Sequence, residues 1–182
     1  MNLISLPISD LSITDAASLA AKIGANCNEI LKWDAIAQTW ISYNTAMPPQ
    51  AAFPIVAGEG YFVTVNALSN LELSGEGWNS PFGISLVTGY NMIGIPINDP
   101  TIQTAADLFS KIGPDCLEVY KWDAIGQSWI SYNPYMPPQA AFDIEGGEGY
   151  LVRMTGAGTL MLTGESWCPG ECPTPSCAFT II

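Results

Sequence analysis

The chain contains the same sequence pattern twice. Lys-Trp-Asp-Ala-Ile begins at Lys32 and again at Lys121, and Trp-Ile-Ser-Tyr-Asn begins at Trp40 and again at Trp129. The offset is 89 residues in both cases. It holds without a gap between residues 2–78 and 91–167, and a self-match of this length marks a duplicated domain. Because a unit of 89 residues can bury a core of its own, we expect two small tandem domains rather than the coils of a solenoid.

The duplication divides the chain into four parts. Repeat one covers residues 1–78, a linker with an apolar strand covers 79–89, repeat two covers 90–167, and a Cys- and Pro-rich tail covers 168–182. Chemistry seldom needs two copies in so short a chain. The repeat therefore favours a binding or structural role.

Within each repeat, the residue pattern predicts a mainly β domain (α+β) with one short helix. Strands are expected in repeat one over residues 2–8, 29–34, 39–44, 61–65 and 71–73. Residues 29–34 and 39–44 should form a hairpin. Thr14 is expected to cap a helix over residues 15–23, which Gly24 ends, and Thr104 and Gly113 should do the same in repeat two.

The composition describes a folded, acidic chain. It is 48% hydrophobic and only 12% charged, unlike a disordered protein. Seventeen acidic against five basic residues give a net charge of −12, with no basic stripe. Nucleic acid and anionic membrane surfaces are therefore disfavoured as partners. Membrane insertion is not expected either, since no apolar stretch approaches the roughly 20 residues that a spanning helix needs.

The five cysteines favour an oxidising compartment. All five are disulfide candidates: Cys27 and Cys116, which share one repeat position, and Cys168, Cys172 and Cys177 in the tail. Cysteines this dense in a Pro-rich segment are typical of exported proteins. Zinc and free thiols are the alternatives, but the tail spacings are wrong for zinc and the chain has no histidine. An odd count suggests one intermolecular bond, for which Cys27 is the candidate.

The motifs of one repeat resemble a kind of module found in secreted proteins. They are Asn-Leu-Ile-Ser-Leu-Pro at Asn2, Lys-Trp-Asp at Lys32, Trp-Ile-Ser-Tyr at Trp40, Gly-Glu-Gly-Tyr-Phe-Val at Gly58 and Leu-x-Leu-x-Gly at Leu71. This order resembles repeated modules of large secreted and cell-surface proteins of bacteria and archaea, which open with a Gly-Trp-Asn-Leu-Ile type motif. The resemblance implies an exterior location and a non-catalytic role, and it transfers no functional residue. The chain departs from it by placing Met1 and Tyr90 where the opening Trp would stand.

No catalytic, cofactor or metal site is expected. The absence of histidine removes the commonest general base and the nucleophile arrangements that depend on it. Paired carboxylates of a glycosidase could be imagined among the acids, such as Asp34 with Glu59, but each repeat would then be a separate active site in a domain too small for an evident cleft. The acidic composition is the only support for a calcium site, since no Asp-x-Asp-x-Asp-Gly pattern occurs in the sequence. Lys22, Lys32 or their copies in repeat two could form an isopeptide crosslink with an asparagine. The alternative, which we favour, is that these lysines are solvated.

The tryptophans have two interpretations. Trp33, Trp40 and Trp78, with their copies in repeat two, could form a platform on which sugar rings stack. The alternative, which we favour, is that they pack the hairpin and the seam between domains. Trp33 stands between two charged neighbours, so it is expected to face inward.

The end of the chain is apolar and has no core of its own. Its residues are Ala178, Phe179, Thr180, Ile181 and Ile182. Without a gap, residues 179–182 align with residues 90–93 and with residues 1–4. With a shift, they align instead with residues 84–87, a strand-like segment that precedes repeat two and has no counterpart before repeat one. Because a free strand and an uncovered sheet edge favour pairing, we expect this assembly strand to join the first domain of another copy.

Such head-to-tail pairing does not close on itself and would build an extracellular filament or surface layer. Copies of the chain itself are then the expected partners. The strand could instead fold back on its own molecule. The alternatives are a non-polymerising surface or adhesion module, which could be a fragment of a longer array, and a carbohydrate-binding module with a polysaccharide as partner.

Overall fold

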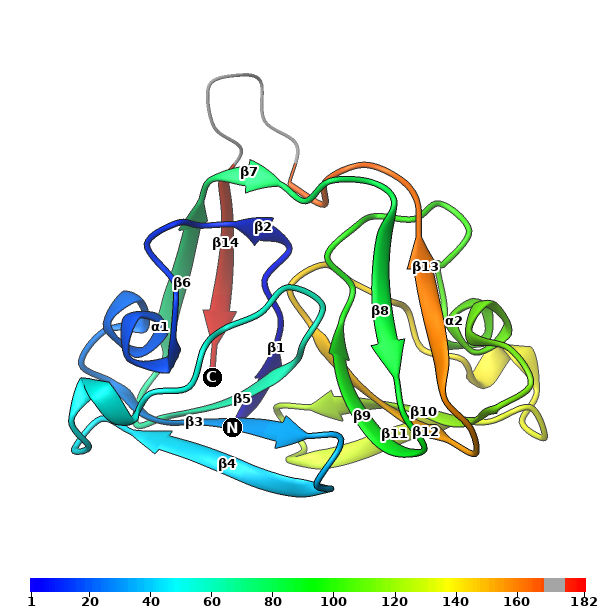
Figure 1. The fold of residues 1–182 in the computed structure, drawn as a ribbon, viewed down its shortest axis with the longest axis horizontal. Coiled ribbons are helices and arrows are strands. Elements are labelled where there is room, and N and C mark those ends of the chain that lie inside the picture. The colour runs from blue at the N-terminus through cyan, green and yellow to red at the C-terminus, as the bar shows by residue number, and fades with distance from the viewer. Residues whose placement is uncertain (169–175) are drawn as a thin grey trace.

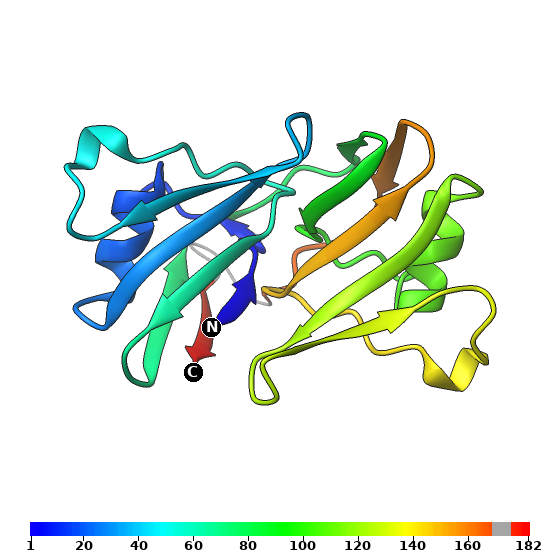
Figure 2. The ribbon, with the colours of Figure 1, turned by 90° about the horizontal axis from the view of Figure 1, so that it is seen from below.

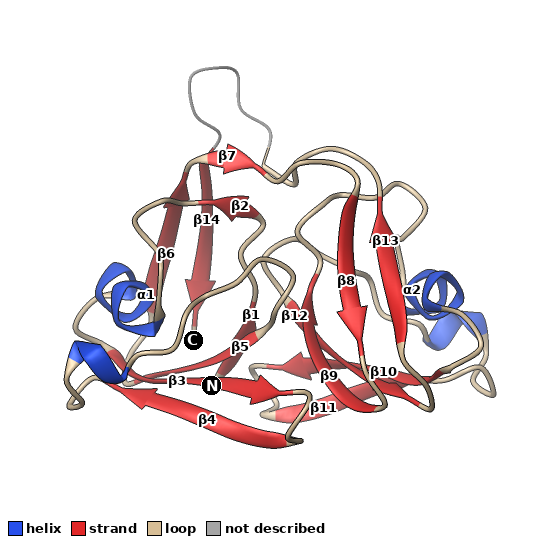
Figure 3. Ribbon diagram, in the orientation of Figure 1, coloured by secondary structure: helices blue, strands red, loops and turns tan. Residues whose placement is uncertain are grey.

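Each repeat folds around a four-stranded antiparallel sheet and one short helix, and the two halves of the molecule look alike (Figure 1). A computed structural model describes residues 1–168 and 176–182. The two sheets lie side by side along one side of the molecule, and the helices lie at its two flanks (Figure 3). The predicted mainly β class, with two similar halves that each carry one helix, is confirmed.

Repeat one has its sheet strands in the order β1-β5-β3-β4. Its elements are β1 Asn2–Ile4, β2 Ile8–Ser9, α1 Ala16–Ile23, β3 Cys27–Asp34, β4 Thr39–Asn44, the 3-10 helix η1 Pro49–Ala51, β5 Tyr61–Val65, β6 Ser69–Ser74 and β7 Glu76–Gly77. The predicted hairpin is present, since β3 and β4 pair from Glu29–Asn44 to Asp34–Thr39. The predicted first strand is divided into β1 and β2.

Repeat two has the equivalent order β9-β12-β10-β11. Its elements are β8 Phe82–Leu86, β9 Gly89–Gly94, α2 Ala105–Ile112, β10 Cys116–Asp123, β11 Ser128–Tyr132, η2 Pro138–Ala140, β12 Gly149–Met154 and β13 Gly158–Leu162, and β14 Ser176–Ile181 follows in the tail. Each helix packs on the inner face of its sheet and helps to enclose a separate apolar core.

The two helices are capped at equivalent repeat positions, and one of the two predicted cap residues was wrong. Asp15, not Thr14, caps α1: its carboxylate accepts the Ser18 N–H at 2.8 Å, and the Ser18 hydroxyl accepts the Asp15 N–H at 2.9 Å. Thr104 occupies the equivalent position and caps α2 as predicted. The prediction of Thr14 was wrong because a capping box pairs the residue just before the helix with the third residue inside it.

The apolar tail strand lies against its own molecule. In repeat two, β8 pairs with β13, and in repeat one β14 takes the equivalent place beside β6 (Figure 1). Phe179 pairs with Leu71 as Ile84 pairs with Leu160, which is the shifted alignment of the sequences. Ile181 is fully buried in the core of repeat one. The strand expected to join another copy therefore covers the β6 edge of its own chain.

A side-chain clasp holds the end of this strand. The Asn2 side chain donates to the Ile182 carbonyl oxygen at 2.5 Å and accepts the Ile182 N–H at 3.1 Å. Asn91 makes the same two bonds to Val87, at 2.7 and 2.8 Å. The tail thus reproduces, from a distant part of the chain, a contact that repeat two makes locally.

Candidate functional site

The seam between the repeats is built by two equivalent hydrogen bonds. The indole N–H of Trp33 donates to the Tyr90 carbonyl oxygen at 2.8 Å, and that of Trp122 donates to the Met1 carbonyl oxygen at 2.8 Å. Met1 and Tyr90 occupy the same repeat position, so each hairpin holds the first strand of the other repeat. This reciprocity is the hallmark of a twofold interface, made here within one chain.

One glutamine adds to each of these contacts. Gln38 accepts the Tyr90 N–H at 2.8 Å and donates to the Tyr90 carbonyl oxygen at 2.9 Å. Gln127 accepts from the Met1 amine and donates to the Met1 carbonyl oxygen. Both glutamines have left-handed backbones, with φ of 53° and 49°. Such a conformation is uncommon outside glycine, and here it aims the side chain across the seam.

Backbone bonds and a small apolar cluster complete the seam. The Ser5 N–H donates to the Gly147 carbonyl oxygen at 2.8 Å, and the Gly94 N–H donates to that of Gly58 at 3.0 Å. Between the sheets lies a third core around Leu3, Phe62 and Met92. Each repeat therefore has its own core, and the two share this one.

Four of the six tryptophans are structural anchors. Trp33 and Trp122 hold the seam, Trp78 donates to the Leu6 carbonyl oxygen at 3.0 Å, and Trp167 donates to that of Ile95 at 2.7 Å. Contrary to the prediction that it faces inward, Trp33 does not face the core of its own repeat, because residues alternate along β3 and Ile30 occupies that face. It lies on the outer face of the sheet, where the other repeat covers it.

Trp40 and Trp129 differ from these four. They occupy the same repeat position, their side chains are exposed by 47% and 38%, and neither indole N–H bonds to a described residue. Both line a groove of about 320 Å³ on the outer faces of the two sheets. Figure 2 shows these two sheets side by side. The lining is almost wholly apolar and consists of Met1, Leu31, Trp40, Phe62, Trp122 and Trp129.

The rings in this groove stand at steep angles to one another. The Phe62 ring makes an angle of 88° with Trp122, 74° with Trp129 and 50° with Trp40. Edge-to-face pairs of this kind are favourable for aromatic rings. The rings that line the groove therefore do not form one coplanar platform.

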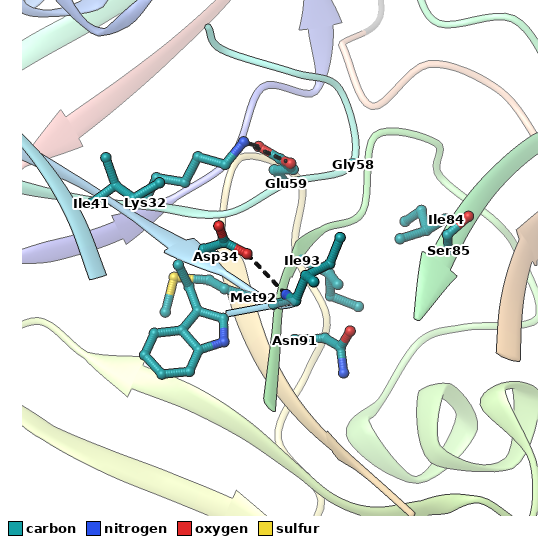
Figure 4. Close-up of a pocket in the computed structure, with 13 residues that line it drawn as sticks. Lys32, Asp34, Ile41, Gly58, Glu59, Ile84, Ser85, Asn91, Met92 and Ile93 are labelled. Atoms are coloured by element: carbon teal, nitrogen blue, oxygen red, sulfur yellow. Dashed lines mark hydrogen bonds and ion pairs between the residues drawn. The ribbon is translucent and has the colours of Figure 1, made fainter. Parts of the chain in front are cut away.

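Two equivalent clefts flank the seam. The first, drawn in Figure 4, has a volume of about 360 Å³ and carries an ion pair between Lys32 and Glu59 at 2.8 Å. The Tyr61 hydroxyl donates to Glu59 at 2.7 Å. Burial and the negative Glu59 raise the pKa of Tyr61 above its usual range. The second cleft contains Glu148, which pairs with Lys121 at 2.7 Å.

The carboxylates proposed for catalysis do reach one cleft, but both are held by other groups. Asp34 and Glu59 line the cleft of Figure 4. Asp34 accepts the N–H groups of Ile36 and Ala37, both at 2.9 Å, and so fixes the hairpin turn. Glu59 is held by its lysine and tyrosine. The arrangement explains both carboxylates as structural groups.

The lysines considered for crosslinking pair with acids rather than asparagines. Lys22 pairs with Asp10 at 3.0 Å, and its counterpart Lys111 pairs with the buried Asp99 at 3.0 Å. Burial alone would raise the pKa of Asp10. Hydrogen bonds from Ser12, from the backbone of Ser74 and from Lys22 outweigh it and hold that pKa well below its usual range. These pairs anchor each helix to the loop before it.

The structure distinguishes the cysteines. Cys168 and Cys177 form a disulfide that ties β14 to the end of repeat two. Cys27 and Cys116 are free and buried, and burial raises the pKa of each thiol to about 11. Cys27 is therefore out of reach of another molecule's cysteine, contrary to the proposed intermolecular bond. Cys172 lies outside the described residues.

The described residues contain no cluster of three or more His, Cys, Asp or Glu side chains that could hold a metal ion. Neither helix in the described part of the chain has the length and apolar character to cross a bilayer.

Comparison with known proteins adds no relative. No protein-family model, no curated protein and no solved structure matches the chain. The candidate site therefore rests on geometry alone, and the aromatic groove is its centre.

Proposed function

We propose that this chain is a non-catalytic attachment module of an exterior surface, which binds its ligand in the aromatic groove. The pair Trp40 and Trp129 carries the proposal. The other four tryptophans use their indole N–H inside the molecule, while these two are partly exposed and their N–H groups bond to no described residue. Exposed tryptophans gathered in one apolar groove are characteristic of binding surfaces.

The exterior location has independent support. The Cys168–Cys177 disulfide is of a kind that persists in oxidising compartments and is rare in reducing ones. The resemblance of the repeat motifs to secreted surface modules agrees with it. The rigid seam suits an attachment role, since it fixes Trp40 and Trp129 relative to each other before a ligand arrives.

Head-to-tail assembly into a filament is the second candidate. It is favoured by the β14–β6 ladder, which a strand from another copy could make with the same register. Exchange would require β14 to leave its own core and to break the Asn2–Ile182 clasp. The disulfide would also have to move with the strand. We therefore favour the closed molecule, in which β14 pairs with β6 of its own chain, over the filament.

The test is retention on immobilised materials. Oxidised protein would be applied to a panel of neutral polysaccharides, anionic polysaccharides and gelatin, together with the variants Trp40→Ala and Trp129→Ala. The wild type should be retained on at least one material, and each Trp variant should lose most of that retention. Because both side chains are partly exposed, thermal unfolding should show that the variants remain folded.

The matched control is a pair of apolar side chains on the same hairpins. Ile36 and Ile125 are equivalent turn residues, exposed by 88% and 86%, and neither lines the groove. Ile36→Ala and Ile125→Ala should retain wild-type binding. Retention that survives loss of both tryptophans, or no retention on any material, would overturn the proposal.

A further inference from the structure

We infer that the ligand of the aromatic groove is a single chain of a neutral polysaccharide. This inference rests on the proposed function and names the ligand class for the same site. It is carried by the shape of the groove, by a polar cleft that adjoins it and by the charge of the surroundings.

The groove matches the two kinds of surface that a sugar ring presents. Pyranose rings have C–H faces that stack on aromatic rings and hydroxyl groups at their edges. Trp40 and Trp129 are exposed by 47% and 38%, and their indole N–H groups, which bond to no described residue, are hydrogen-bond donors for hydroxyl oxygens. A purely apolar ligand would leave these donors unused.

A polar cleft shares a wall with the groove. Trp122 lines both the groove and the second seam cleft, a cavity of about 330 Å³ that also contains Glu145, Glu148 and Thr180. Consecutive residues, Met1 and Asn2, line the two cavities. A sugar unit stacked in the groove therefore has carboxylate and hydroxyl partners for the next unit along the chain. An apolar peptide would not form hydrogen bonds with the polar groups of this cleft.

The charge of the site selects against an anionic ligand. No ionised side chain lines the groove, although Met1, which lines it, carries a charged amine. The adjoining cleft presents Glu145 and Glu148, of which Glu148 is paired with Lys121. The whole chain carries a net charge of −12. A uronic-acid or sulfated polymer would be repelled at this surface, whereas a neutral polymer would not.

The inclination of the rings selects a single chain over a flat crystalline face. The rings of Trp122, Trp129 and Trp40 stand at 88°, 74° and 50° to the ring of Phe62. Rings inclined in this way do not offer the coplanar platform on which a flat surface would stack. The volume of about 320 Å³ lies at the small end of ligand sites, so we expect one or two sugar units to be enclosed.

Titration with soluble oligomers tests this inference. The probes are the hexasaccharides of cellulose, laminarin, xylan and mannan, with hexagalacturonate as the anionic probe and decaproline as the peptide probe for an aromatic groove. Tryptophan fluorescence and calorimetry would be recorded for each. At least one neutral hexasaccharide should bind, and Trp40→Ala and Trp129→Ala should each weaken it about tenfold or more, as truncation of a buried aromatic contact does.

Two further variants test the polar cleft and the specificity of the effect. Thr180→Val, which keeps the strand but removes a hydroxyl from the cleft, should weaken binding severalfold. Ile125→Ala should leave it unchanged. Tryptophan-dependent binding of decaproline or hexagalacturonate, with no neutral sugar bound, would overturn the ligand class and leave the attachment function standing. Binding of none of the probes, with no retention on the material panel, would overturn both.

Discussion

The indole N–H of Trp33 donates to the carbonyl oxygen of Tyr90, 2.8 Å away, across the boundary between two repeats. The Trp122–Met1 pair makes the same bond in the opposite direction. The molecule therefore behaves like a twofold dimer joined into one chain. The aromatic groove lies on this seam, so its geometry depends on the bonds that hold the repeats together.

Removing one of these bonds should destabilise the fold. Trp33→Phe keeps an aromatic ring but loses the indole donor, and Gln38 still donates to the same carbonyl oxygen. The expected loss in the free energy of unfolding is about 1–2 kcal/mol. Urea denaturation would measure it. Trp40→Phe is the control, because its indole N–H bonds to no described residue, and equal losses for the two variants would contradict the assigned role of Trp33.

Shortening a buried side chain of the tail strand should destabilise repeat one. Ile181 is fully buried, and Ile181→Ala should cost about 2–4 kcal/mol through lost burial and the cavity left behind. Thr180→Ala changes the exposed neighbour on the same strand and should cost less than about 1 kcal/mol. Chemical denaturation of both variants checks the difference. A tail that dangled in solvent would show no difference between them.

Reduction of the disulfide should also lower stability. Cys168 and Cys177 are separated by 9 residues, and a loop of this size predicts a contribution of about 2–3 kcal/mol from the restricted unfolded chain. Thermal unfolding with and without a reductant measures this contribution. The double variant Cys168→Ser/Cys177→Ser should lack the response. An equal response in wild type and variant would assign the effect to other thiols.

Acid should destabilise the protein through the buried Asp10 and Asp99. Their pKa values are held well below the usual value because hydrogen bonds and a lysine outweigh the opposing effect of burial. A carboxylate with a lowered folded-state pKa contributes stability that is present above about pH 4 and lost as the pH falls further. Unfolding free energy should drop below about pH 4, and Asp99→Asn should flatten that drop.

The control for the acid experiment is Asp143→Asn. Asp143 is exposed, and its carboxylate makes no ion pair or hydrogen bond with a described residue. Its replacement should leave the pH profile as in the wild type. Should Asp99→Asn have the wild-type profile as well, Asp99 would not be the group that titrates.

The two free thiols should be protected in the folded state. Cys27 and Cys116 are buried, and burial raises their pKa to about 11, so little thiolate is present at neutral pH. Alkylation by iodoacetamide, followed by peptide mass spectrometry, should modify them only in denaturant. Rapid labelling of Cys27 in the native protein would reopen the proposed intermolecular bond.

Local elements could be predicted from the sequence because their causes are local. The β3–β4 hairpin and the cap residue Thr104 both follow from neighbouring residues. Thr14 was a wrong choice of cap, but aligning repeat one on repeat two would have replaced it with Asp15. This signal was present in the chain and needed only the repeat to find it.

The candidate site depends on contacts that no local pattern records. Trp33 and Trp40 are both aromatic strand residues, and only the packing of the second repeat buries one and leaves the other open. The tail posed a similar problem. Of its two alignments, the structure agrees with the shifted one on residues 84–87, but pairing within one molecule and pairing between two molecules use the same backbone ladder. Sequence alone does not distinguish them.

Isotope-mixed crosslinking tests most directly whether β14 closes its own molecule. Asn70 and Thr180 are exposed and face each other across the β6–β14 ladder, so a disulfide should form in Asn70→Cys/Thr180→Cys. Unlabelled and ¹⁵N-labelled variants would be denatured together, refolded as an equal mixture, oxidised and analysed by peptide mass spectrometry. The closed molecule predicts crosslinks only within unlabelled or within labelled chains. Mixed crosslinks in a ladder of oligomers would contradict it and restore head-to-tail exchange.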